Sequence, residues 1–195
     1  AYIGGDYDIR RNGGGISIRD ADAKLQNLIV QDNIAKYYGG GIYIDDTQWR
    51  TNIVDLFNIK IIRNSSEVVG RGGIYGDNAI INADKILIAN NTSAGAFNGG
   101  ILNMTRSTIT DNGDNAEAIY CGYADLNFNN CIIWGQINQC SGGHDLYVDY
   151  TDYKDLSNFS WFITGSNNID SDPLFTDPDN GDYTLQAGSP CIDAG

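Results

Sequence analysis

Aromatic rings beside glycine pairs are the side chains of this sequence best suited to binding chemistry. Such rings pack against the CH faces of sugars and need no charge to do so. Seven of them lie near glycine pairs, and we expect the first five to form a carbohydrate-binding surface: Tyr37, Tyr38, Tyr43, Trp49, Tyr75, Tyr120 and Tyr123. This pattern favours contact with a glycan over catalysis.

The charged side chains give only weak signs of catalysis. Asp45-Asp46 with Trp49 and Arg50 is the combination of carboxylates, ring and base that a sugar-cleaving site needs, but it is also typical of a solvated loop. The 12 Lys and Arg residues are scattered and form no cluster that would neutralise a uronate. The single histidine, His144, has no visible nucleophile partner, so we expect it to be a polar surface or capping residue. We expect no catalytic residues.

The C-terminal region contains one candidate calcium site. The stretch 177–182 holds three carboxylates within six residues, which makes Asp177, Asp179 and Asp182 candidate calcium ligands. Asn180-Gly181 also favours a type I′ hairpin turn, and an EF-hand loop would place its glycine one position later. We therefore expect a plain turn first and calcium second, with no other cofactor.

Cysteines and glycosylation triplets give the candidate covalent modifications. The four cysteines fit neither a zinc site nor a redox pair, and their even number would allow two disulfides in an oxidising compartment, with reduced core thiols as the alternative: Cys121, Cys131, Cys140 and Cys191. Three connectivities are possible. Asn-x-Ser/Thr triplets make five asparagines candidates for glycosylation: Asn64, Asn90, Asn91, Asn103 and Asn158.

Composition and charge limit the class of protein. With a net charge of −13 and a pI near 4.1, the sequence has no basic stripe that would bind nucleic acid. It also contains no run of 18 apolar residues, so no membrane-inserted helix is expected. The chain has 26 Ile, 22 Asn and 24 Gly residues against one Met. β-Branched residues and turn formers therefore dominate, which predicts an all-β protein.

Two alternating signals recur along the chain and predict its architecture. Gly-Gly-Ile steps occur at 14–16, 40–42, 72–74 and 99–101, with a degenerate fifth at 117–119; between them an apolar residue precedes Asn33, Asn64, Asn91 and Asn112 by three positions. Such repeats predict a right-handed parallel β-helix whose coils stack about 4.8 Å apart. At its corners, glycine would allow positive φ or close backbone approach, and asparagine, which also tolerates the left-handed conformation, would form a hydrogen-bonded ladder.

The two ends of the chain carry different expectations. We expect coils over residues 1–140 and a continuous capping segment over 141–195. The first strand-like residues follow the N-terminus at once, so we expect either further coils upstream or another copy that pairs end to end in a filament.

The C-terminal residues carry a family resemblance. The runs 168–175 (NIDSDPLF), 181–185 (GDYTL) and 188–195 (GSPCIDAG) resemble the ending of secreted bacterial right-handed β-helix proteins of the choice-of-anchor Q type. The upstream repeats are similar to those of polymorphic outer membrane proteins and adhesins. This resemblance implies an exported, extracellular or cell-surface protein.

Together these observations predict a non-catalytic extracellular β-helix module for adhesion, glycan contact or structural scaffolding. The alternatives are a polysaccharide lyase or hydrolase, or an accessory domain of one, and a self-assembling extracellular filament subunit. The expected partners are surface glycans or neighbouring copies.

Overall fold

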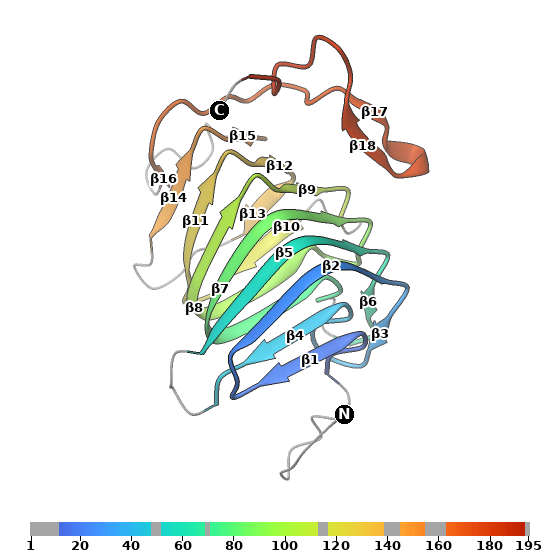
Figure 1. Cartoon of the computed structure of the whole chain (residues 1–195), viewed down its shortest axis with the longest axis vertical. Helices are drawn as coiled ribbons and strands as arrows, with labels where there is room; N and C mark the ends of the chain where they lie inside the picture. The colour runs from blue at the N-terminus through green and yellow to red at the C-terminus, as the bar shows by residue number, and fades with distance from the viewer. Residues whose placement is uncertain are drawn as a thin grey trace.

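The chain winds into a parallel β-solenoid of about five turns (Figure 1). The structure is a computed structural model that describes residues 12–47, 52–68, 71–112, 117–138, 145–154 and 163–193. The all-β parallel β-helix predicted from the repeats is confirmed. None of the described residues forms a helix long and apolar enough to cross a membrane. The expectation about the N-terminal end concerns residues 1–11, which lie outside the described residues.

Each full coil contributes strands to three faces. The first face holds β1 (Ile16–Arg19), β4 (Ile42–Asp45), the starts of β7 (Ile74–Ala89) and β8 (Gly95–Thr105), β10 (Glu117–Cys121) and β13 (Gln136–Asn138). The second holds the starts of β2 (Ala23–Gln31) and β5 (Ile53–Ile62), the middle of β7, the end of β8, β11 (Asp125–Asn129), β14 (Leu146–Asp149) and β16 (Ile163–Thr164). The third holds the ends of β2, β5 and β7, then β9 (Thr108–Thr110), β12 (Ile132–Trp134) and β15 (Asp152–Tyr153).

Alternating side chains fill the space inside the three faces. Along β7 buried and partly exposed residues alternate, and β-branched Ile74, Ile81, Ile86 and Ile88 point inward. Because strands have a side-chain period of two, every second residue reaches the core. Burying one such side chain contributes about 1.5–3 kcal/mol, so the isoleucine columns are the main stabilising feature of the solenoid.

The corner between the second and third faces is built from residues whose backbone is in the left-handed conformation. Residues with φ between +47° and +60° stack on one another there: Asn27, Asn58, Lys85, Arg106, Asn130, Tyr150 and Asn167. Asparagine accepts this conformation at low cost, whereas Lys85, Arg106 and Tyr150 do not favour it. The stacked position therefore imposes the bend even where the residue type opposes it.

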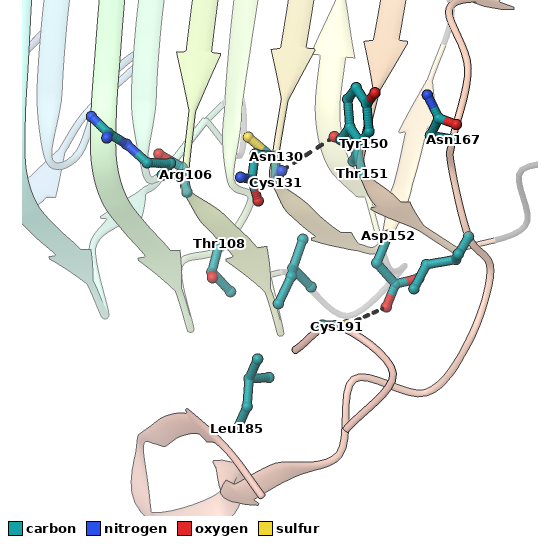
Figure 2. A pocket seen from close by; sticks show the side chains of 13 residues that line it. Arg106, Thr108, Asn130, Cys131, Tyr150, Thr151, Asp152, Asn167, Leu185 and Cys191 are labelled. Carbon is teal, nitrogen blue, oxygen red and sulfur yellow. Dashed lines mark hydrogen bonds between the residues drawn. The ribbon is translucent and has the colours of Figure 1, made fainter. Parts of the chain in front are cut away.

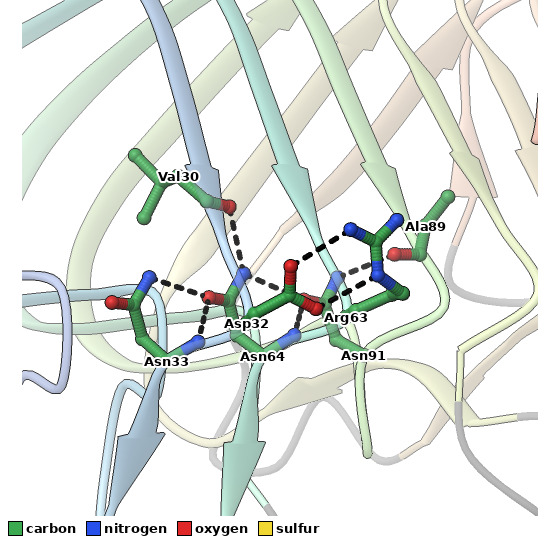
Figure 3. A network of polar contacts seen from close by, with 7 residues as sticks. All are labelled: Val30, Asp32, Asn33, Arg63, Asn64, Ala89 and Asn91. Atoms are coloured by element: carbon green, nitrogen blue, oxygen red, sulfur yellow. Dashed lines mark hydrogen bonds and ion pairs between the residues drawn. The ribbon is translucent and has the colours of Figure 1, made fainter.

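An asparagine ladder supports the next corner (Figure 3). The Oδ1 atom of Asn64 accepts the backbone and side-chain N–H groups of Asn33 at 3.1 and 2.9 Å, and Asn91 and Asn112 repeat the pattern. The predicted ladder is thus confirmed. The left-handed residue, however, is the one before each asparagine, as at Asn90 (φ 56°) before Asn91.

Close backbone approach explains the first three glycine pairs. A Cβ atom on Gly40 would lie 2.2 Å from the carbonyl oxygen of Ser65, and one on Gly73 would lie 1.8 Å from that of Ala94. Positive φ occurs one position earlier, at Gly13 and Gly39, and not at the paired glycines of these three steps. Of the two reasons considered, close approach is therefore the one that applies to these three pairs, whereas Gly99 and Gly100 of the fourth pair do have positive φ, 88° and 82°.

The fourth Gly-Gly-Ile step does not repeat the first three. Ile74 pairs with Gly95, while Gly100 and Ile101 pair with Ala79 and Ile80 at the start of the second face. The prediction that residues 99–101 continue the series is therefore wrong. The coil from Ile74 to Gly95 spans 21 residues, against 32 for the coil before it, so the repeat shifts along the chain.

The degenerate fifth step returns to the original column. Ile119 pairs with Gly95, which places residues 117–119 in register with the first three Gly-Gly-Ile steps. How closely a segment resembles the Gly-Gly-Ile motif therefore does not determine its position in the coil. The more divergent copy occupies the equivalent place.

Regular coils continue past residue 140. β14 and β15 pair in register with β11 and β12, and Ile169 still bridges to Asp152. The capping segment thus begins after Ile169 among the described residues, later than expected from the sequence.

The capping segment folds over the C-terminal end of the solenoid (Figure 1). It contains β17 (Phe175–Asp177), the 3-10 turn η3 (Pro178–Asn180) and β18 (Asp182–Leu185). The two strands form the predicted hairpin, but the 3-10 turn with Gly181 at φ 83° replaces a type I′ turn. The Nδ2 group of Asn90 donates to the Tyr183 hydroxyl at 2.7 Å, so the hairpin rests against a solenoid corner.

Candidate functional site

The first face carries a row of tyrosines beside a row of carboxylates. In β4, Ile42 and Ile44 point inward, so Tyr43 and Asp45 point away from the core. Register pairs Tyr43 with Tyr75 and Asp45 with Asp77 on the next coil. We call Tyr38, Tyr43, Tyr75, Asp45 and Asp77 the tyrosine–aspartate surface.

The three rings of this surface pack together. Tyr43 and Tyr75 are stacked, with centroids 5.4 Å apart and planes 7° from parallel. The Tyr38 ring lies 4.5 Å from that of Tyr75 at 36°. Tyr43 is only 5% exposed, while Tyr38 and Tyr75 are partly exposed, so solvent reaches these two rings.

Asp45 is a buried carboxylate held by two donors. Arg19 Nη2 donates to its Oδ2 atom at 2.7 Å, and the Tyr43 hydroxyl donates to the same oxygen at 3.0 Å. Burial and the nearby Asp45 charge raise the pKa of Tyr43 to about 12. The Tyr43 hydroxyl therefore stays protonated at neutral pH and acts only as a donor to Asp45.

Asp77 has weaker partners. The Tyr75 hydroxyl and Asn98 Nδ2 lie 3.5 and 3.4 Å from its carboxylate oxygens, and within the described ranges it forms no ion pair. Burial, followed by the neighbouring Asp45 charge, raises the pKa of Asp77. This carboxylate is consequently the less compensated negative charge of the surface and lies next to Tyr75, one of its two partly exposed rings.

A gap interrupts the tyrosine row one coil further on. Ala96 occupies the position between Tyr75 and Tyr120, and the Arg71 guanidinium lies 4.0 Å over the Tyr120 ring. Stacked coils are about 4.8 Å apart, so an aromatic and cationic row extends beyond the surface along the solenoid axis. Such a row suits an extended ligand better than a compact one.

The structure brings together three of the five predicted aromatic residues. Tyr38, Tyr43 and Tyr75 form the cluster; Tyr37 instead has Lys36 Nζ 5.7 Å above its ring. Trp49 lies outside the described residues, as do Arg50 and His144.

The Asp45-Asp46 pair does not act as two neighbouring carboxylates. Asp46 is fully buried, and its Oδ2 atom accepts the backbone N–H of Asn52 at 3.0 Å. The partner of Asp45 on this face is Asp77, one coil away. Sequence reasoning missed this pairing, although a repeated Tyr-x-Asp pattern marks it at 43–45 and 75–77 and recurs at 147–149.

A cavity of about 240 Å³ lies between the capping segment and the last coils (Figure 2). Buried Asp152 accepts a hydrogen bond from the Cys191 thiol at 3.0 Å, and its other oxygen accepts the Ser171 N–H at 3.1 Å. Arg106 also lines the cavity, but its Nε and Nη2 groups both donate to the carboxylate of Asp84. The cavity therefore connects the cap to the solenoid and offers little free charge to a ligand.

Burial, as the largest cause, raises the pKa of Asp152, which predicts a pH-dependent stability. The folded protein binds this proton more tightly than the unfolded chain, so its contribution is present below the ordinary carboxyl pKa and is lost as pH rises through the raised value. The free energy of unfolding of Asp152→Asn should therefore increase relative to that of wild type as pH rises from 3 to 7. Urea unfolding of both proteins across this range checks it, and a pH-independent difference would contradict it.

The three candidate calcium ligands do not converge. Asp177 accepts the Asn180 side-chain N–H at 2.8 Å, and Asp182 accepts the backbone N–H of Thr184 at 3.0 Å. Nowhere in the described ranges do three or more His, Cys, Asp or Glu side chains gather as metal ligands. The carboxylates at 177 and 182 thus support the turn, while Asp179 is the acidic residue in the first turn of η3.

The cysteines do not form the two expected disulfides. Cys131 and Cys191 carry free thiols, and burial is the main cause that raises the pKa of each to about 12. Cys121 is buried and donates its thiol to the carbonyl of Ala124 at 3.3 Å, while Cys140 lies outside the described residues. Two disulfides would need all four cysteines, so the alternative of reduced core thiols describes Cys131 better.

The glycosylation candidates divide by burial. Asn64 and Asn91 are 1% and 2% exposed, and their amides are committed to the ladder, so neither is accessible to a glycosyltransferase in the folded state. Asn103 is partly buried and donates to Asn82 at 2.9 Å. Asn90 is exposed but bonded to Tyr183, and Asn158 lies outside the described residues.

The fold and the tyrosine–aspartate surface define an all-β parallel solenoid with an aromatic, acidic first face. No protein-family model, curated protein or solved structure matches the chain. Its function is therefore argued from the surface itself.

Proposed function

We propose that this chain is a non-catalytic extracellular β-solenoid module that binds glycans through the tyrosine–aspartate surface. The observation that carries this proposal is the packed trio of Tyr38, Tyr43 and Tyr75 on one face. Two of its rings are partly exposed, and aromatic faces of this kind stack on the CH surfaces of sugars. The neighbouring, partly exposed carboxylate of Asp77 can accept hydrogen bonds from sugar hydroxyls.

Extracellular location is supported by the sequence. The C-terminal resemblance to secreted choice-of-anchor Q proteins points to export, and the net charge of −13 agrees with a soluble surface domain. A rigid rod of stacked coils would hold the binding surface at a defined place. We therefore favour adhesion or glycan contact over a purely structural role.

Replacing Tyr75 by alanine should weaken glycan binding at least about tenfold, because Tyr75 is the ring that contacts both other tyrosines. Binding of immobilised oligosaccharides, first screened on a glycan array, measures the effect.

Tyr147→Ala is the matched control. Tyr147 also donates to the aspartate two residues later, at 3.3 Å, but it lies on β14 of the second face. Equal losses from both substitutions would contradict the assignment of binding to the first face.

Glycoside hydrolysis is the second candidate, favoured by one observation. Asp45 and Asp77 are in-register neighbours on adjacent coils, and strand spacing of about 4.8 Å is close to the roughly 5–5.5 Å carboxyl separation of retaining glycosidases. Asp77, with its raised pKa, would be the acid, and Asp45 beside Arg19 the nucleophile. Release of new reducing ends from any polysaccharide, lost in Asp77→Asn, would establish this activity over simple binding.

A further inference from the structure

We propose that the tyrosine–aspartate surface selects glycans without carboxylate groups and excludes uronate polymers; this inference rests on the glycan-binding function proposed above. The rings that meet the ligand lie beside two carboxylates of adjacent coils. A uronate stacked on Tyr75 would bring a third carboxylate to the same place. A neutral sugar would bring hydroxyl donors instead.

The positive charges near the surface do not cancel this effect. Arg19 forms an ion pair with Asp45 at 2.7 Å, which leaves Asp77 as the carboxylate next to Tyr75. The backbone of Arg71 pairs with that of Tyr38, but its guanidinium lies over the ring of Tyr120, which is two positions beyond Tyr75 along the row. A ligand centred on Tyr75 and Tyr38 therefore meets the Asp77 charge first.

Partial burial strengthens the repulsion. Asp45 is 7% exposed and Asp77 is partly buried, and charges in such places are screened less by water and salt than exposed ones. Burial and the Asp45 charge both raise the pKa of Asp77, which shows that negative charge is already unfavourable here. Selection against a further anion follows directly from this crowding.

Matched pairs of ligands test the proposal. Cello-, manno- and galacto-oligosaccharides are each compared with the same oligosaccharide oxidised at C6 to the uronate, and methyl-esterified polygalacturonate with its free acid. We expect wild type to bind the uncharged member of any recognised pair at least about tenfold more tightly at low salt, a difference that added salt reduces.

Two variants identify the cause. Asp77→Asn keeps the shape of the side chain. It should raise the affinity for the charged ligand, so that the affinities for the uncharged and charged members of a pair differ by less than about threefold. Arg71→Gln should leave the ratio unchanged. Circular dichroism and urea unfolding confirm that both variants fold.

The outcomes separate the two proposals. If uncharged and charged members bind equally, or the charged member binds more tightly and loses this in Arg71→Gln, the selectivity is overturned while glycan binding stands. If no pair binds and Tyr75→Ala behaves as wild type throughout the glycan screen, the glycan-binding function itself fails. A tenfold preference that Asp77→Asn removes supports both.

Discussion

Asn91→Ala should lower the free energy of unfolding by about 3–5 kcal/mol, because it leaves several buried polar groups without partners. Asn91 is 2% exposed, and its Oδ1 atom accepts both N–H groups of Asn64 at 2.8 and 3.0 Å. Its Nδ2 group donates to the carbonyl of Ile61 and to Asn112, both at 2.9 Å. Alanine supplies none of these atoms, and water cannot reach the site in the folded protein.

Asn103→Ala is the control for this ladder effect. Asn103 also stacks between two coils, donating to Asn82 and accepting from Asn127 at 2.9 Å in each case. Its row lies on the outside of the second face, where water can replace both bonds, so the loss should stay below about 1 kcal/mol. Urea unfolding followed by circular dichroism compares the two variants. Similar losses would show that burial does not control the strength of these ladders.

Gly73→Ala is expected to cost at least about 3 kcal/mol or to prevent folding, because the new methyl group overlaps backbone atoms of the next coil. The Cβ atom would lie 1.8 Å from the carbonyl oxygen of Ala94 and 2.8 Å from its carbonyl carbon. Gly73 and Ile74 donate their N–H groups to Ser93 and Ala94 at 2.9 and 3.0 Å. Making room for the methyl group requires these coils to separate, which breaks the pairing on which the core depends.

A graded series keeps this prediction testable if Gly73→Ala does not fold. A Cβ atom on Gly15 would lie 2.7 Å from the carbonyl oxygen of Gly41, so its substitution should cost less than that of Gly73. Gly181 has no atom within 4 Å but has φ 83°, so alanine there should cost about 1 kcal/mol from backbone strain alone. Soluble yield and thermal unfolding rank the three. A different order would contradict close approach as the reason for the glycine pairs.

The candidate site was only partly predictable from the sequence. Ring positions next to glycine pairs indicated Tyr38, Tyr43 and Tyr75, because each pair begins a coil and the following strand alternates inward and outward residues. The partnership of Asp45 with Asp77 was missed. Adjacent aspartates at 45 and 46 suggested a local carboxylate pair, but the strand ends there and Asp46 turns into a buried corner contact.

The sequence by itself determined the type of fold. Isoleucine alternation, glycine pairs and spaced asparagines are each visible as a local pattern within the sequence of one coil, although the contacts they make are between coils. The solenoid and its asparagine ladder could therefore be predicted from these patterns.

Only the tertiary structure decided which residues face one another. Successive positions in the column of Ile16, Ile42, Ile74, Gly95 and Ile119 are 26, 32, 21 and 24 residues apart. Because coil length varies at the corners, where chain can be added without disturbing the strands, sequence spacing cannot assign register. Core packing and inter-coil hydrogen bonds assign it, and they placed Gly99-Gly100-Ile101 at a different corner and Asp45 beside Asp77.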